Sequence, residues 1–230
     1  MQRQTPLMTG ETYHIFNRGA HKLPIFNHSD DYKRFQVNLH VGNHSEPVLI
    51  REIVGSKKYK EPFSGYPADK SLVDVLGYCL MPTHFHLILR QKTDDGITRF
   101  MKKVSGGYSM YFNLKYGHSG TLLQGIFKSS HINTDPYFNW IFAYVHLNPV
   151  SLAESSWSEK GLSDVARAQA AVDAYQFSSY YDYYIVQRPE RSILAFEEGA
   201  QYTEKRKDVI GLLASYGRGR VLFPMLDSFN

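Results

Sequence analysis

Two apolar runs of strand length, separated by only two residues, constrain the fold of this chain more than any other feature. Residues 73–81 read VDVLGYCLM and residues 84–91 read HFHLILRQ, with Pro82-Thr83 between them. Both runs are rich in aliphatic, aromatic and β-branched side chains, which is typical of strands inside a sheet. Because the break is so short, we predict that the two runs form a central antiparallel pair.

The rest of the first 150 residues alternates between strand and helix patterns. Residues 12–16 favour a strand that ends in a turn at 17–19, and Ser29-Asp30-Asp31 can cap a following helix. Apolar spacing predicts a helix over 96–115, with a kink at Gly106-Gly107. A further strand is expected over 121–132, bulged at Gly125. A last helix is expected to begin at Asp135-Pro136 and to end near Asn148, just before Pro149.

These patterns predict an α+β fold, in which helices pack on an antiparallel sheet of four to five strands. The sheet domain is expected over residues 1–150, with an insertion around 43–70 that contains one short strand at 48–53. Residues 151–230 are predicted to form a mainly helical C-terminal extension, since 162–174, 178–187 and the stretch after 196 have helical or tyrosine-rich patterns.

Cysteine usage and hydropathy exclude several classes of protein. The single cysteine, Cys79, cannot form an intramolecular disulfide, and no cysteine pair is present to hold zinc. No segment approaches the ~18 uninterrupted apolar residues of a membrane-spanning helix, and the N-terminus has no apolar signal-peptide core. We therefore expect a soluble, untargeted protein of the reducing cytoplasm that makes no membrane contact.

Charge and aromatic content point to nucleic acid as a partner. The chain has 17 Tyr and 14 Phe against 2 Trp, and its formal net charge is +4. From Lys92 to His131 there are six basic residues against two acidic ones. Aromatic rings can stack on unpaired bases while lysines neutralise phosphates. On charge alone, a merely solvated helix face remains an equal alternative.

The segment His84-Phe85-His86 is the sharpest local motif. In a strand, side chains at i and i+2 lie on the same face with Cα atoms ~6.5–7 Å apart, so the two imidazoles could share one cation while Phe85 enters a core. Such a pair is common, and the spacing alone leaves a structural or surface role open.

A second motif lies in the helix expected after Asp135. Tyr144 and Asn148 are four residues apart and so lie on one helix face, where a phenol and a carboxamide would converge. A half-buried tyrosine beside a capping asparagine would have the same spacing.

Taken together, the motifs resemble the single-tyrosine HUH transposases, particularly the REP-associated tyrosine transposases. The resemblance covers about residues 11–150, where several motifs occur in the family's order. They are YHIFNRG (13–19), GYCLMPTHFHLIL (77–89), MKKVSGGYSMYFN (101–113), SGTLLQGIFKS (119–129) and YVHLNPV (144–150), and AYQFSSY (174–180) is similar to a segment that often follows. One departure is that Leu123 and Ile126 stand where relatives commonly have an aromatic residue and an arginine.

The resemblance implies a fold and a set of site residues. The fold would be that of an HUH endonuclease, with a ferredoxin-like or RRM-like sheet. Tyr144 would be the nucleophile, with Tyr108 and Tyr111 as its rivals, and His84, His86 and Asn148 would hold Mg²⁺ or Mn²⁺. The residues assigned to DNA binding are Arg18, Lys102, Lys103, Tyr108, Tyr111, Lys115 and Lys128. The remaining histidines, His14 among them, are interpreted as surface or core residues.

The implied activity is metal-dependent cleavage and rejoining of single-stranded DNA through a 5′-phosphotyrosine, on hairpin or palindromic repeat DNA. One alternative is a domesticated, non-cleaving DNA-binding protein or repressor. Another is a metal hydrolase without a covalent intermediate, which the absence of an Asp or Glu in MPTHFHLIL disfavours. The oligomeric state stays open, because the relatives include homodimers that exchange nucleophile helices and monomers.

Overall fold

The computed structural model describes residues 6–46, 63, 70–155, 157–202, 209 and 211. Three features expected from the sequence lie outside these residues. They are the strand at 48–53 within the insertion, the basic cluster at 57–60, and most of the C-terminal helix that follows residue 202, where only residues 209 and 211 are described.

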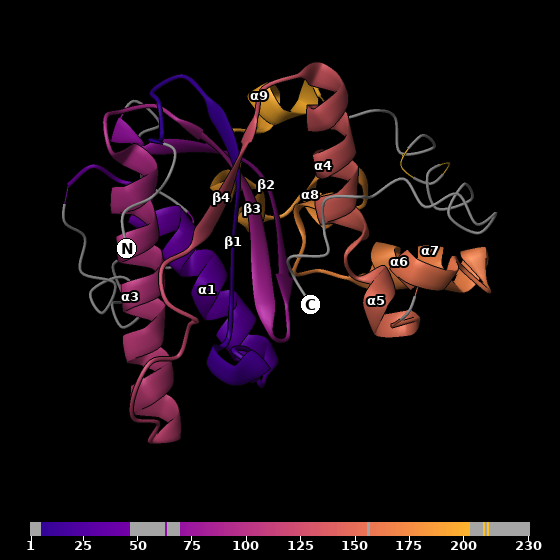
Figure 1. Cartoon of the computed structure of the whole chain (residues 1–230), viewed down its shortest axis with the longest axis horizontal. Coiled ribbons are helices and arrows are strands. Elements are labelled where there is room, and N and C mark those ends of the chain that lie inside the picture. The colour runs from indigo at the N-terminus through magenta and orange to yellow at the C-terminus, as the bar shows by residue number, and fades with distance from the viewer. Residues whose placement is uncertain are drawn as a thin grey trace.

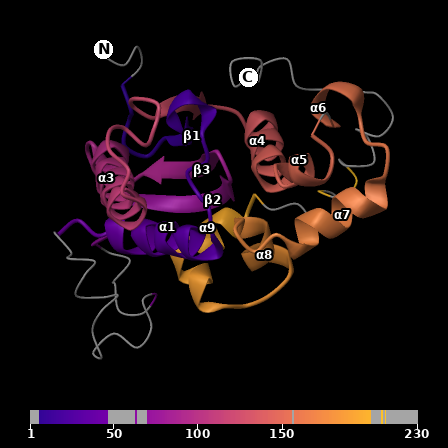
Figure 2. The same cartoon turned by 90° about the horizontal axis from the view of Figure 1, so that it is seen from below.

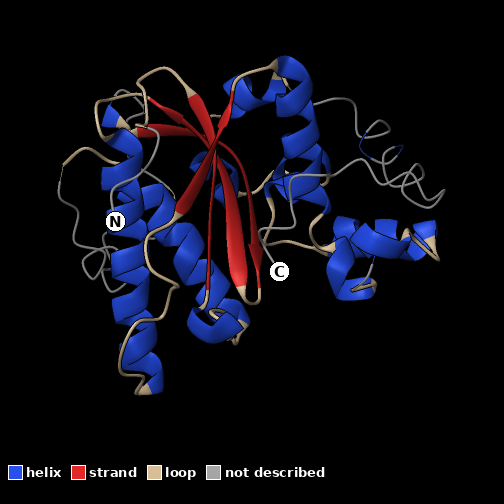
Figure 3. Cartoon of the chain, viewed as in Figure 1, coloured by secondary structure: helices blue, strands red, loops and turns tan. Residues whose placement is uncertain are grey.

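Four strands form one antiparallel sheet. They are β1 (Thr12–Arg18), β2 (Val73–Met81), β3 (His84–Gln91) and β4 (Lys128–Ile132), in the spatial order β2-β3-β1-β4. Strands β2 and β3 pair from Met81↔His84 to Val73↔Gln91, which confirms the predicted central hairpin. Strand β1 pairs antiparallel with both β3 and β4. Figure 3 shows the strands in red, with helices on either side of them.

Two long helices connect the strands and cover one face of the sheet. Helix α1 (Ser29–Gly42) links β1 to β2, and helix α3 (Gly96–Tyr116) links β3 to β4. The two lie side by side on the same side of the sheet in Figure 1. The chain thus forms two interleaved βαβ units, with the order 4-1-3-2 of a ferredoxin-like sheet. The predicted α+β fold class is confirmed.

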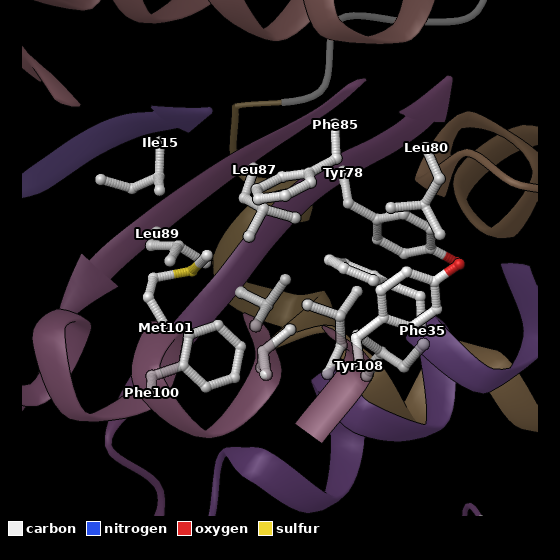
Figure 4. Close-up of a cluster of buried hydrophobic side chains, with 14 of the residues drawn as sticks. Ile15, Phe35, Tyr78, Leu80, Phe85, Leu87, Leu89, Phe100, Met101 and Tyr108 are labelled. Carbon is white, nitrogen blue, oxygen red and sulfur yellow. The ribbon is translucent and has the colours of Figure 1, made fainter. Parts of the chain in front are cut away.

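The main core lies between this face of the sheet and the two helices (Figure 4). Its strand residues alternate along the chain, as period 2 requires: Tyr78 and Leu80 from β2, and Phe85, Leu87 and Leu89 from β3. Each of these side chains is fully buried. From the helices come Phe35, Phe100, Met101, Val104 and Tyr108, among others.

Helix α4 (Asp135–Leu147) packs on the opposite face of the sheet (Figure 2). Its buried residues Ile141, Phe142 and Val145 join the strand residues of opposite phase, including Cys79 and Ile88. The helix begins where expected, but its cap is Thr134, whose Oγ1 accepts a hydrogen bond from Tyr137 N. Asp135 is itself the first helical residue.

The C-terminal extension is helical in its described part, as predicted. It contains α5 (Val150–Ala153), α6 (Trp157–Lys160), α7 (Val165–Ala174), α8 (Ser179–Tyr184), the 3₁₀ helix η3 (Pro189–Ile193) and α9 (Phe196–Ala200). Several of its groups bond to β2. Among them, Phe177 O accepts from Leu80 N, Ala195 N donates to Val75 O, and Tyr183 OH donates to Leu76 O. The extension thus covers an edge strand that would otherwise present unpaired backbone groups.

Two local expectations were wrong. Helix α3 continues unbroken through Gly106-Gly107, since Val104 and Tyr108 on either side are held in the core. The strand expected over 121–132 begins only at Lys128, because Gly125 adopts a left-handed conformation with φ of 65°. In the described part of the chain, no helix is long and apolar enough to cross a bilayer.

Candidate active site

The histidine pair lies on the α4 face of the sheet. Strand β3 turns Phe85 and Leu87 into the main core, and therefore turns His84 and His86 to the other side. The two imidazole centroids are 5.0 Å apart. His84 is partly exposed, whereas His86 is 1% exposed. The predicted placement of both imidazoles on one strand face is confirmed.

Each imidazole of the pair hydrogen-bonds through Nδ1. Nδ1 of His84 lies 3.0 Å from Oγ1 of Thr83, in the turn that precedes the strand. Nδ1 of His86 lies 2.9 Å from Nε2 of His14, which comes from β1. His14 is paired in register with Ile88, so it is the diagonal neighbour of His86 across the two strands.

His14 is the site residue that sequence reasoning missed. The sequence gives it no partner at a spacing typical of a metal or catalytic site, since His86 is 72 residues away. Two local signals could have pointed to it. His14 stands in the YHIFNRG motif at 13–19, and in β1 Tyr13 and Ile15 enter the main core, so His14 must face the other way.

Tyr144 lies over the histidines from helix α4. Its ring centroid is 5.5 Å from that of His86 and 6.4 Å from that of His14, edge-on in both cases. On its other side the ring stacks on Trp140, with centroids 5.7 Å apart and an interplanar angle of 6°. These contacts restrict the orientation of a phenol that is only partly exposed.

Asn148 completes the group at the end of α4. Its Nδ2 donates a hydrogen bond to the carbonyl oxygen of Tyr144, 3.0 Å away, one helical turn back. The side chain also hydrogen-bonds to the imidazole of His84 and to the phenol of Tyr144. The structure therefore brings together the four residues that the sequence proposed for catalysis and metal binding.

Burial sets the charge state of the site. It lowers the pKa of His84 to about 4 and that of His14 to about 3, and it places the pKa of His86 well below the usual value. Burial also raises the pKa of the Tyr144 phenol to about 12, although the hydrogen bond with Asn148 opposes this. At neutral pH the imidazoles are uncharged and the phenol keeps its proton.

The donor set fits a divalent cation bound by nitrogen and amide oxygen. Neutral imidazoles can donate a ring nitrogen to a metal, and Asn148 uses Nδ2 as a donor, which leaves Oδ1 as its acceptor atom. In the described ranges no cluster of three or more His, Cys, Asp or Glu residues is arranged to hold a metal.

Two of the residues assigned to DNA binding flank the site. Arg18, at the end of β1, is the register partner of His84, and its guanidinium hydrogen-bonds to Gln124. Lys128, at the start of β4, is the register partner of Phe16, and its ammonium lies 6.0 Å from that ring centroid. Both cations thus lie at the sheet end that carries His84.

The other five residues assigned to DNA binding lie on α3, across the sheet from His84. Tyr108 is fully buried, and its hydroxyl donates to Ile25 O. Tyr111 and Lys115 both hydrogen-bond to Asp31, at 2.9 and 2.7 Å. Lys103 donates to the carbonyl oxygens of His44 and Glu46, and Lys102 is exposed. The structure does not bring these five to the histidine site.

Comparisons with known proteins agree with the sequence motifs. Residues 41–148 match the family described as "Transposase IS200 like", a range that includes His84, His86, Tyr144 and Asn148. The match agrees with the resemblance to transposases that the sequence motifs indicate. No curated protein matches the chain. Among solved structures, the chain is similar to a REP-associated tyrosine transposase bound to a REP hairpin, with 12% identity over 79% of this chain and 83% of the other, and a TM-score of 0.48.

Proposed function

We propose that this chain, whose residues 41–148 carry the match to IS200-like transposases, cleaves and rejoins single-stranded DNA through a covalent bond to Tyr144. The observation that carries the proposal is the position of the Tyr144 ring, 5.5 Å from that of His86 and on the same face as His84. A transposase of this kind needs a nucleophile and a cation site at one place on the protein.

His84, His86 and Asn148 are the residues that would hold the cation, which we propose to be Mg²⁺ or Mn²⁺. When bound, it would withdraw charge from a non-bridging phosphate oxygen and stabilise the transition state. The three side chains are uncharged at neutral pH, so they leave the positive charge of the cation undiminished for the phosphate.

Tyr144 performs the bond exchange. Its phenolic oxygen forms a bond to phosphorus, and the bond from phosphorus to the 3′-oxygen breaks. The products are a 5′-phosphotyrosine and a 3′-hydroxyl, which takes up a proton. Burial raises the pKa of the phenol to about 12, so the phenol is protonated at neutral pH and has to give up its proton in the attack. The reverse attack by a 3′-hydroxyl rejoins strands without an external energy source.

The rest of the local architecture orients this nucleophile and its substrate. Trp140 stacks on the Tyr144 ring, and Asn148 hydrogen-bonds to both the backbone and the phenol of Tyr144. Fixing the attacking group in this way lowers the entropy lost on reaching the transition state. Arg18 and Lys128 lie at the same sheet end, where they can neutralise phosphates of a single-stranded or hairpin DNA.

The test is trapping of the covalent product. The protein is incubated with labelled single-stranded or hairpin DNA and Mn²⁺, and a denaturing gel detects the protein–DNA adduct. Tyr144→Phe, which removes one hydroxyl, should abolish the adduct and preserve DNA binding. Tyr111→Phe is the matched control on α3 and should keep the adduct. Binding without any adduct in the unsubstituted protein would instead support a non-cleaving DNA-binding protein.

A further inference from the structure

The histidine of β1 that bonds to His86 takes no part in the bond exchange proposed above. His14 lies before the matched range of residues 41–148, and although it stands in the YHIFNRG motif at 13–19, the resemblance assigned it no role in the site. It is 1% exposed, as is His86, and their rings are nearly parallel, with an interplanar angle of 17°. The 2.9 Å contact between Nε2 of His14 and Nδ1 of His86 is thus a hydrogen bond shielded from water.

A neutral imidazole has one N–H donor and one nitrogen acceptor, so this contact allows two arrangements. Either His86 carries the proton on Nδ1 and donates to His14, or His14 carries it on Nε2 and donates to His86. In the second arrangement the remaining proton of neutral His86 is on Nε2, which then cannot bind a cation. Only the first arrangement leaves a lone pair on Nε2 of His86.

We infer that His14 is a positioning residue that accepts the hydrogen bond from Nδ1–H of His86 and so keeps Nε2 of His86 as the nitrogen that binds the cation. The inference rests on the proposed function, because it assigns a partner to one of the cation's ligands. Such outer partners fix the tautomer and the ring orientation of a ligating histidine.

Because the contact between His14 and His86 is buried, water cannot replace His14 as the acceptor. If His14 lost its acceptor, Nδ1–H of His86 would be left unsatisfied inside the protein, at a cost that favours moving the proton to Nε2. The partner of His84 is different, because the Thr83 hydroxyl can either donate or accept. His84 and His86 thus differ in their Nδ1 partner, which is a hydroxyl for His84 and a buried imidazole for His86.

A neutral acceptor also suits the chemistry better than a carboxylate would. A buried Asp or Glu at position 14 would supply negative charge next to the cation site and weaken its pull on phosphate oxygen. The imidazole of His14 fixes the tautomer of His86 without adding charge.

Two substitutions distinguish the effect of the hydrogen-bond acceptor of His14 from the effect of its side-chain volume. His14→Gln places an amide oxygen near the position of Nε2 and retains an acceptor, whereas His14→Leu keeps similar volume and removes it. The matched control is His146→Leu, which removes another fully buried imidazole of the α4 face, one whose Nε2 lies 2.7 Å from Oγ of Ser179. Thermal unfolding of all variants confirms that each is folded.

The first readout is the tautomer itself, from the ring ¹⁵N chemical shifts of His86 at neutral pH without metal. We expect Nδ1–H in the unsubstituted protein, in His14→Gln and in His146→Leu, and a shift toward Nε2–H in His14→Leu. An Nε2–H tautomer in the unsubstituted protein would overturn the inference even if no variant at position 14 folds.

The second readout is Mn²⁺ affinity by isothermal titration. His14→Leu should bind Mn²⁺ about 10–100-fold more weakly, the usual effect of losing such a partner, and His14→Gln should recover most of the loss. Equal affinity in His14→Leu and the unsubstituted protein would overturn the role of His14 alone. Absence of Mn²⁺ binding in the unsubstituted protein would instead overturn the cation site of the proposed function.

Discussion

The two faces of strand β3 differ in the side chains they present. One face carries apolar core residues, and the other carries the polar residues of the candidate site. Phe85, Leu87 and Leu89 point into the core beneath α1 and α3, where every strand side chain is apolar or, like Tyr78, bonded to a fixed partner. On the other face His84 and His86 lie beneath α4 with Tyr144 and Asn148, and all four side chains are polar.

The polar groups near the main core also differ from those of the α4 face in their hydrogen bonding. The carboxylate of Asp31 accepts hydrogen bonds from Lys115, Tyr111, Tyr116 and the backbone N–H groups of Asn27 and His28. Both oxygens of the Asp31 carboxylate are therefore hydrogen-bonded within the protein. The α4 face instead brings together polar groups that carry no formal charge at neutral pH. One strand can thus present core residues and a candidate site at alternate positions.

The largest effect is expected on the α4 face. Replacing both His84 and His86 by Ala should abolish metal-dependent adduct formation and Mn²⁺ binding, because two nitrogen ligands are lost, while the midpoint of thermal unfolding changes little. Isothermal titration and the adduct gel measure this. His118→Ala with His131→Ala removes two imidazoles from outside the site and should leave both readouts unchanged. Undiminished Mn²⁺ affinity in the first variant would refute the metal assignment.

Phe85, the residue between the two histidines, should affect stability when it is substituted. Phe85→Ala leaves a cavity beneath α1 and should lower the free energy of unfolding by about 3–5 kcal/mol. Urea denaturation measures the loss. Leu114→Ala on α3, where the side chain is 79% exposed, is the matched control and should change stability by less than about 0.5 kcal/mol. A loss for Phe85→Ala no larger than the control's would contradict the division between the two faces.

Acid should weaken the α1–α3 face through Asp31. Burial alone raises the pKa of this carboxyl, but hydrogen bonds from Lys115, Tyr116 and two backbone N–H groups outweigh it and lower the pKa to about 2. A lowered folded-state pKa contributes stability above the unfolded value of about 4, and this contribution is lost as the pH falls through about 2.

The expected loss from Asp31 is on the order of 2 kcal/mol between pH 4 and pH 2, measured by urea denaturation at several pH values. Asp31→Asn should be less stable at pH 7 and should lack this part of the pH dependence. Asp30→Asn is the control, since Asp30 is an exposed neighbour in the same first helical turn. Parallel curves for Asp31→Asn and the unsubstituted protein would exclude the role of Asp31.

The smallest effect compares the cations of the two faces in DNA binding. Removing Arg18 and Lys128 together should reduce the salt dependence of single-stranded DNA affinity by about 1.4 logarithmic units per decade, from ~0.7 per phosphate contact. Lys102→Ala with Lys103→Ala tests the alternative on α3, which we also expect to bind phosphate but to contribute less. Fluorescence anisotropy at several salt concentrations decides between them, and a larger change for the α3 pair would place the DNA path on that face.

Much of the fold could be read from local pattern. The hairpin of β2 and β3 was predicted because alternation and a two-residue break are properties of neighbouring residues. The pairs His84 with His86 and Tyr144 with Asn148 were predicted because strand and helix periods fix which nearby side chains share a face. Their roles are what the family resemblance implies, and the structure shows that the two pairs meet.

What the tertiary structure decided involves residues far apart in the chain. Pairing of β1 with β3 places His14 against His86, and packing of α3 against the main core buries Tyr108 and occupies Tyr111 and Lys115. The same lysines and tyrosines have a pattern in the sequence that suits a DNA-binding helix. Periodicity states which side of an element is apolar, but strand register and the face on which each helix packs depend on the whole core, and these determine which polar residues reach the site.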